Sequence, residues 1–155
     1  MSNNSSIKTI PNAIFFASVE EMIAEGRRVE MTVRGFSMRP FVRNGADVVV
    51  LAPVEGSDLE VGMVVLFRYR GGHILHRLVG IDGGRLTFEG DGNYRQVERA
   101  EVDDVVAYVA AVKLAGGREF AYGSGAWRRR TRISMVRKWG RRVALDVKNK
   151  LLKKR

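Results

Sequence analysis

Residues 63–80 read MVVLFRYRGGHILHRLVG and predict a β-hairpin. The first arm is the apolar run 63–67, whose length and composition are typical of a buried strand. Gly71-Gly72 supplies the turn, because glycine adopts the positive φ angles that a tight hairpin connection requires. The second arm, residues 73–80, is apolar apart from two histidines and an arginine. Two antiparallel strands are therefore expected on either side of this turn.

Short strands are also predicted on both sides of this hairpin. Residues 29–33 alternate between apolar and polar side chains, the pattern of a strand with one buried face. The remaining expected strands cover residues 48–51, 85–89, 105–114 and 118–122. Many short strands separated by glycine-rich turns are typical of antiparallel sheets that curl into barrels. The sequence therefore predicts a mostly β fold with an antiparallel, barrel-type sheet.

One helix is predicted on each side of the β region. Ser18 followed by Glu21 forms a capping box, which predicts a short helix over residues 19–25 that Gly26 ends. Residues 132–152 carry one apolar stripe at helical spacing. The stripe consists of Val136, Trp139, Val143, Val147 and Leu151. We therefore expect a disordered N-terminus (1–12), one main domain (13–125) and a basic amphipathic C-terminal helix (126–155).

The positive charge of the chain is concentrated in this last segment. The formal net charge is +10, yet residues 126–155 contain 13 Lys and Arg against the single acid Asp146. The rest of the chain is slightly acidic, so nucleic acid is not an expected partner. Two interpretations of the tail stay open. It binds the anionic face of a membrane through its apolar stripe, or it packs that stripe on its own domain.

Composition excludes several kinds of chemistry. The chain has no cysteine and only two histidines, which removes thiol nucleophiles, disulfides and thiolate zinc sites. No cofactor and no metal are expected. No stretch approaches the roughly 20 apolar residues of a membrane-spanning helix, and no targeting segment is evident. We therefore expect a cytoplasmic protein, with peripheral attachment to the cytoplasmic membrane face if the tail binds lipid.

Three polar side chains stand out as candidates for catalysis. Ser37 lies in Gly35-Phe36-Ser37-Met38-Arg39-Pro40, where a flexible glycine and a rigid proline fix a turn around the hydroxyl. His76 lies in a largely apolar strand, and a neutral imidazole is a natural general base. Asp91 lies in Gly90-Asp91-Gly92-Asn93, where a carboxylate can hold the imidazole of a triad in one tautomer.

Each candidate also has a purely structural explanation. Ser37 fits an ordinary turn serine, His76 a core histidine bonded to a backbone carbonyl, and Asp91 an Asx turn. His73 lies two residues from His76 in the same strand, and we expect it to be exposed near the turn.

Taken together, the order and spacing of these motifs resemble the signal peptidase clan of serine peptidases, which also includes the self-cleaving SOS repressors. The resemblance covers residues 28–112. Its boxes are 35–40 around the nucleophile, 61–67, the base strand 76–80, the segment 88–93 and the strand 104–109. The pair His76-Arg77 is similar to the archaeal and endoplasmic-reticulum branch, whereas the bacterial signal peptidases and the repressors carry Lys-Arg.

The resemblance implies a function and roles for the site residues. Ser37 attacks the scissile carbonyl, His76 takes its proton, and Asp91 supports the site. The expected activity is endoproteolysis of a peptide or precursor protein, with small residues at P1 and P3 and the substrate extended along the strand before Ser37. Two alternatives remain: a catalytically weak binding or regulatory module that retains the peptidase fold, and a self-cleaving regulator. Self-cleavage is disfavoured, because the 34 residues before Gly35 contain no Ala-Gly or Cys-Gly bond.

Overall fold

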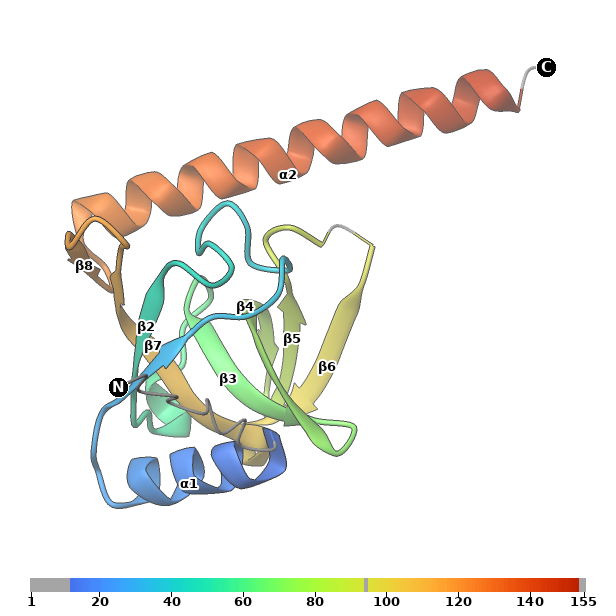
Figure 1. The fold of residues 1–155 in the computed structure, drawn as a ribbon. Helices are drawn as coiled ribbons and strands as arrows, with labels where there is room; N and C mark the ends of the chain where they lie inside the picture. Colours follow the sequence, from blue (N-terminus) through green and yellow to red (C-terminus); the bar gives the residue numbers. More distant parts are fainter. Residues whose placement is uncertain (1–11, 94, 154–155) are drawn as a thin grey trace, which may run out of the picture.

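A computed structural model describes residues 12–93 and 95–153. It shows an antiparallel β structure with a short N-terminal helix and a long C-terminal helix, as the sequence predicts (Figure 1). The helices are α1 (Asn12–Ala24) and α2 (Gly125–Leu152), with short 3-10 turns η1 (Gly56–Asp58) and η2 (Val102–Asp104). The strands are β1 (Val29–Thr32), β2 (Val48–Ala52), β3 (Val64–Tyr69), β4 (Gly72–Asp82), β5 (Arg85–Glu89), β6 (Val97–Glu101), β7 (Val105–Lys113) and β8 (Glu119–Ala121).

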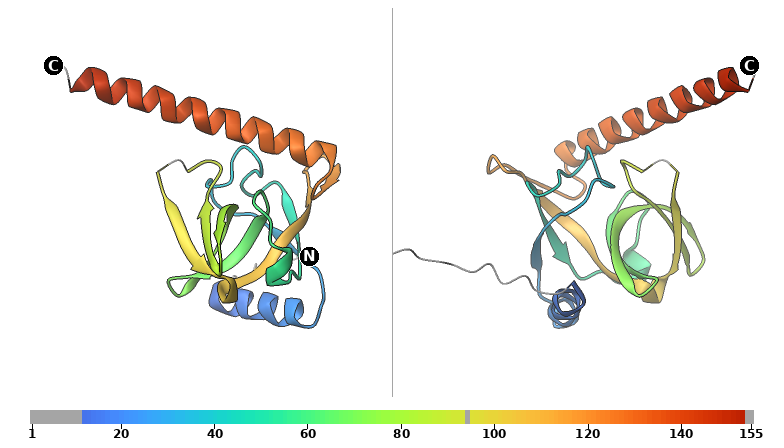
Figure 2. Two further views of the ribbon diagram at one scale, coloured as in Figure 1. Left: turned by 180° about the vertical axis from the view of Figure 1, so that it is seen from behind. Right: turned by 45° about the vertical axis from the view of Figure 1, so that its right-hand side comes forward.

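The sheet curls but does not close, so the predicted barrel is wrong in this respect. Its strand order is β1-β2-β7-β3-β4-β5-β6, with β8 added to β7. Bulges at Val50/Leu51, Leu66/Phe67 and Leu78/Gly80 bend the sheet, because a bulge adds local twist to one strand. A barrel would need hydrogen bonds between the end strands β1 and β6, and these do not pair within the described residues. Figure 2 shows the curled sheet from two further sides.

The predicted hairpin is present as β3 and β4. Val65 pairs with His76 and Tyr69 pairs with Gly72, so the connecting residues are Arg70 and Gly71. Both have positive φ angles, 49° and 77°, as the favoured two-residue hairpin turn requires. The turn therefore begins one residue earlier than expected. Arg70 accepts the left-handed conformation beside a glycine.

Buried side chains form two clusters, one on each face of the curled sheet. Val64 belongs to one cluster and its neighbour Val65 to the other, because successive strand residues point to opposite faces. The first cluster includes Phe41 and Trp127, whose rings meet edge to face 4.8 Å apart. Trp127 belongs to α2, so the first turns of the C-terminal helix are part of the core. In the other cluster, Phe67 stacks on the ring of Phe88.

Helix α1 begins at Asn12, seven residues before the predicted start. Packing explains the longer helix, because Phe16 stacks on the His73 ring with centroids 4.4 Å apart. Glu20 then binds His73 Nε2 at 2.6 Å and the Arg68 guanidinium at 2.6 Å. His73, expected to be exposed, is therefore half-buried against α1. The sequence predicts disorder for residues 1–12. Asn12 is instead the first residue of α1, and residues 1–11 lie outside the described residues.

Helix α2 begins at Gly125, one residue before the predicted boundary at 126, because Ser124 caps it by accepting a hydrogen bond from the Trp127 N–H at 3.2 Å. The helix crosses one end of the sheet and extends beyond it (Figure 1). Its buried face is formed by Trp127, Ser134 and Lys138. No helix within residues 12–93 and 95–153 has the length and apolar content needed to cross a membrane.

Candidate functional site

Residues 33–47 connect β1 to β2 and contain Ser37, the predicted nucleophile, so we call this segment the nucleophile turn. Gly35 has a φ of 101°, which side-chain-bearing residues rarely adopt, and its N–H donates to Asn44 Oδ1 at 2.9 Å. Met38 and Phe41 are buried in the first cluster and anchor the turn from below. Ser37 directly precedes Met38 and is half-buried. Its hydroxyl is thus carried by a turn that is fixed at both ends.

A second loop, Gly90-Asp91-Gly92, packs directly on this turn. The Gly92 N–H donates to the Ser37 carbonyl at 2.7 Å. A Cβ atom on Gly90 would lie 2.6 Å from the Ser37 carbonyl oxygen, and one on Gly92 would lie 2.6 Å from the Phe36 carbonyl oxygen. Because such contacts are too short for any side chain, both positions require glycine. Gly92 therefore permits close contact between the two loops.

The same loop brings Ser37 and His76 together. A Cβ atom on Gly90 would lie 3.1 Å from His76 Nε2 and 3.2 Å from Ser37 Cβ. His76 Nε2 and Ser37 Cβ are therefore separated by no more than the sum of these two distances. No hydrogen bond joins Ser37 Oγ to Nε2 within the part of the chain that the structure describes. Catalytic hydrogen bonds are often long in unliganded enzymes and shorten when substrate binds.

The carboxylate that contacts the imidazole belongs to Glu98 on β6. His76 Nδ1 lies 2.8 Å from Glu98 Oε2, and the two side chains are 7% and 0% exposed. When Nδ1 donates its hydrogen to the carboxylate, Nε2 carries the lone pair and faces the Ser37 side. Sequence reasoning missed both Glu98 and the strand that carries it. The second carboxylate oxygen, Oε1, is buried without a hydrogen-bond partner among the described residues.

Asp91 lies in the site but is bonded to Arg77. Arg77 Nε donates to Oδ1 at 2.7 Å and Nη2 donates to Oδ2 at 2.6 Å, and both side chains are buried. The guanidinium also donates to the Gly62 carbonyl at 2.8 Å and lies over the Phe41 ring. Asp91 therefore fixes the loop behind Ser37, while the imidazole is held by Glu98.

Helix α2 is fastened to the same loop. Lys138, only 5% exposed, donates to the Gly90 carbonyl at 3.0 Å and to Glu89 at 2.5 Å. Arg77 Nη1 reaches Thr131 Oγ1 at 3.3 Å, and Arg142 adds a second bond to Glu89. The basic helix thus contacts the end of the sheet that carries Ser37 and His76.

Behind the nucleophile turn, Asp47 closes the connection back to β2. Burial raises the pKa of the Asp47 carboxyl, but hydrogen bonds from the Arg43 side chain and backbone more than offset this and keep the pKa below its ordinary value. The Arg43 N–H donates to Asp47 Oδ2 at 2.9 Å. The buried Asp47 is therefore charged at neutral pH and fixes the far end of the turn.

Ser37, His76 and Glu98 lie in the order that a nucleophile, a base and an orienting carboxylate would need for acyl transfer. Among the described residues, no group of three or more His, Asp or Glu side chains is placed to hold a metal ion.

No protein-family model matches the chain, and no curated protein matches it significantly.

Proposed function

We propose that this protein is a serine endopeptidase with Ser37 as nucleophile, His76 as general base and Glu98 as the orienting carboxylate. The proposal rests on how close Ser37 and His76 lie to one another. A Cβ atom on Gly90 would lie 3.1 Å from His76 Nε2 and 3.2 Å from Ser37 Cβ. The Nδ1 atom of the same imidazole is bonded to a fully buried carboxylate. A structural histidine needs no such alignment with a turn serine.

In the proposed reaction, Ser37 Oγ attacks the scissile carbonyl while its proton moves to His76 Nε2. The imidazolium then gives that proton to the departing amine, which leaves an acyl-enzyme ester. Water attacks the ester, again with His76 as base, and the Ser37 hydroxyl is regenerated. The Ser37 N–H makes no hydrogen bond within the described residues and is our candidate oxyanion donor.

The order of motifs supports a relationship to the signal peptidase clan. The nucleophile box, the His76-Arg77 pair and the Gly90-Asp91 box occur in the sequence in the order of that clan. By this resemblance the enzyme belongs with the branch that uses histidine as base and prefers small P1 and P3 residues. The substrate would be a peptide or a precursor protein.

The sheet edge beside Ser37 is a path for an extended substrate. β1 is an end strand of the sheet, and four residues separate its last residue from Ser37. An extended peptide adds to such an edge through backbone hydrogen bonds. Phe36, which is 61% exposed, offers an aromatic surface directly before the nucleophile.

A library of unstructured peptides tests the proposed activity. Mass spectrometry should find the same cut bonds with the wild type and with Ser57→Ala, whose serine lies exposed in η1. Ser37→Ala should produce none of these cuts. Cleavage at the wild-type rate by purified Ser37→Ala would contradict the proposal.

We also propose that the outer face of α2 binds anionic membranes. Trp139 is 69% exposed, and the remainder of the stripe is exposed with it, since the helix packs through its opposite face. Arg and Lys side chains flank the stripe, as expected of a helix that lies on anionic lipid. A second copy is a poorer partner for this face, because each copy brings the same strong positive charge.

Vesicle flotation tests this location. The wild type should float with vesicles containing phosphatidylserine at low salt, and it should not float with pure phosphatidylcholine vesicles. Trp139→Gln combined with Val143→Gln should abolish flotation without unfolding the domain, because both side chains are exposed. Failure of the wild type to float with anionic vesicles would refute the proposed location.

A further inference from the structure

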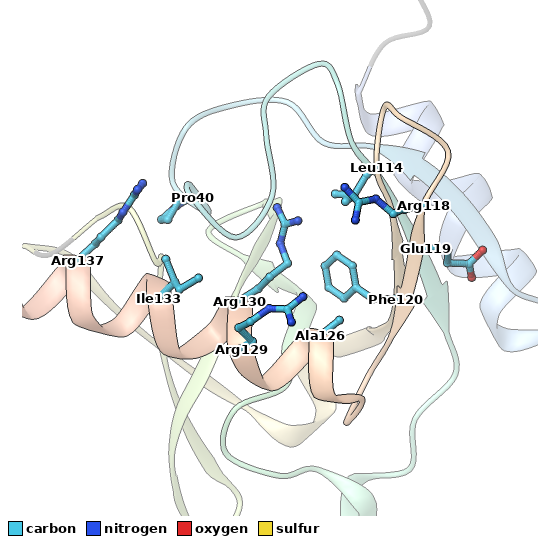
Figure 3. Close-up of a pocket in the computed structure, with 10 residues that line it drawn as sticks. All are labelled: Pro40, Leu114, Arg118, Glu119, Phe120, Ala126, Arg129, Arg130, Ile133 and Arg137. Carbon is cyan, nitrogen blue, oxygen red and sulfur yellow. The ribbon is translucent and has the colours of Figure 1, made fainter.

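A cavity of about 420 Å³ lies between α2, β8 and the nucleophile turn (Figure 3). Its floor is apolar and includes Phe120 and Ile133. Four arginines surround it: Arg118, Arg129, Arg130 and Arg137. Among the described residues, the only acid that lines it is Glu119, which extends away from the other side chains in Figure 3. The cavity therefore combines an apolar floor with a strong positive charge.

Arg130 shows how little of this charge is compensated. Its guanidinium lies over the Phe120 ring, 5.0 Å from the centroid, and the residue is half-buried. Burial lowers the pKa of Arg130, nearby arginines lower it further, and Asp47 opposes them. Asp47, however, already accepts hydrogen bonds from Arg43. Several like charges close together are unfavourable, and a bound anion would relieve that repulsion.

The cavity is close to the proposed nucleophile. Pro40 lines it, and Pro40 follows Ser37 by three residues in the same turn. Three residues span at most about 11 Å, even when fully extended. A peptide whose carbonyl lies at Ser37 can therefore place a side chain a few residues away in this cavity.

From these observations we propose that the cavity binds an acidic segment of the substrate, a few residues from the scissile bond. Glutamate or aspartate carboxylates would pair with Arg130 and Arg118, because a guanidinium offers two parallel N–H donors to a carboxylate. A neighbouring apolar side chain would cover Phe120 and Ile133. An inorganic anion would use the arginines alone and leave this floor uncovered. This inference rests on the proposed peptidase function for its link to cleavage.

Binding is measured with two rhodamine-labelled ten-residue peptides on the Ser37→Ala protein, which cannot cleave them by the proposed route. One peptide carries Glu-Leu-Glu at its centre, and the other carries Gln-Leu-Gln. Fluorescence anisotropy at 150 mM NaCl should give a Kd about tenfold lower for the acidic peptide, as one or two charge-assisted pairs would produce. Equal affinity for the two peptides would overturn the proposal.

Arginine variants locate the binding. Arg130→Gln and Arg118→Gln should each remove most of the preference for the acidic peptide. Arg128→Gln makes the same change in net charge at an exposed position that does not line the cavity, and it should leave the affinity within about twofold. Two substituted positions guard against a folding defect in either one. Equal losses in all three variants would show general charge attraction and overturn the proposal, as would full competition by 10 mM sulfate or by phosphatidylserine vesicles.

A second readout separates this inference from the proposed function. Wild-type protein is treated with a fluorophosphonate that labels reactive serines, in the presence of either peptide. The acidic peptide should slow labelling of Ser37 more than its glutamine counterpart does. Labelling unaffected by either peptide would overturn the link between cavity and substrate. Absence of labelling without any peptide would instead contradict the proposed function, while the anisotropy would still show whether the cavity binds acidic peptides.

Discussion

His76 and Arg77 are neighbours on β4, and each holds a buried carboxylate, but the two carboxylates differ in how fully they are bonded. Both oxygens of Asp91 accept hydrogen bonds from Arg77. Glu98 uses one oxygen for His76, and its other oxygen has no partner among the described residues. Because strand residues alternate, the two pairs lie on opposite faces of the sheet. One strand therefore carries both a structural ion pair and the proposed general base.

This difference in hydrogen bonding explains why we propose different roles for the two pairs. A fully bonded ion pair cannot change its charge without loss of stability, so Arg77 and Asp91 are suited to hold the loop on which Ser37 rests. Glu98 lies 2.8 Å from the imidazole, and its second oxygen has no hydrogen-bond partner among the described residues, so the carboxylate is directed at His76 alone. Glu98 is thus suited to stabilise the imidazolium that forms when His76 takes a proton.

The largest effect is expected from Glu98→Gln. The amide cannot stabilise the imidazolium, and it favours the wrong tautomer of His76. We expect kcat/KM to fall about 10³- to 10⁴-fold while the fold is retained. Steady-state kinetics on a cleaved peptide measure this loss, and circular dichroism checks the fold. An equal loss in Asp91→Asn with Glu98→Gln fully active would reverse the two roles.

Arg77→Met should act mainly on stability. It leaves Asp91 buried without its cation, and we expect unfolding free energy to fall by about 3–5 kcal/mol. Urea denaturation measures the change. The double variant Arg77→Met with Asp91→Leu should recover much of the loss, because neither charge then remains buried. A single variant as stable as the wild type would show that the pair does not support the loop.

The contact between the two loops is tested by Gly90→Ala. The added methyl group would meet the Ser37 carbonyl at 2.6 Å, so one loop must move. We expect this displacement to lower kcat/KM about 10²-fold, since small misplacements at a catalytic site are costly. Gly116→Ala is the matched control, because its methyl group would meet no atom within 4 Å. Similar kinetics for the two variants would remove the loop contact from the account.

Glu20 offers a half-buried counterpart of the buried pairs, since it binds Arg68 and His73. The hydrogen bond from Arg68 is the main reason that the pKa of Glu20 is lowered from 4.5 to about 2. Its stabilising effect is therefore present above pH 4.5 and lost as the pH falls through 2. Solvent screening limits Glu20→Gln to about 1 kcal/mol of destabilisation at pH 7. Denaturation curves of wild type and variant should converge toward pH 2. A gap that widens with falling pH would contradict this sign.

The sequence was sufficient to predict the β3–β4 hairpin, and the resemblance carried by its motifs was sufficient to predict that Ser37 and His76 lie near one another. The sequence was misleading for β6, because the hydrophobicity of its residues assigns them to the wrong faces of the strand. Val97 is 41% exposed and Glu98 is fully buried, so the apolar residue faces solvent and the acid faces the core. Glu98 faces the core because it pairs with His76 on β4. His76 is far from Glu98 in the sequence, so the local pattern around Glu98 does not predict this pairing.

Helix α2 shows the same limit. The apolar stripe is readable from spacing, but the sequence leaves open which face of the helix packs on the domain. Lys138 is buried because the Gly90 carbonyl and Glu89 surround its ammonium group. Long-range hydrogen bonds of this kind override hydrophobicity, and they come from residues far away in the chain.

Mass spectrometry of fluorophosphonate-treated protein tests the central claim most directly. Wild-type protein should carry one adduct, mapped to Ser37, and Ser37→Ala should carry none. Glu98→Gln should be labelled far more slowly than the wild type, since its imidazole is a poorer base. An unlabelled wild type, or an adduct mapped to another serine, would contradict the assignment of Ser37, His76 and Glu98 as a catalytic site.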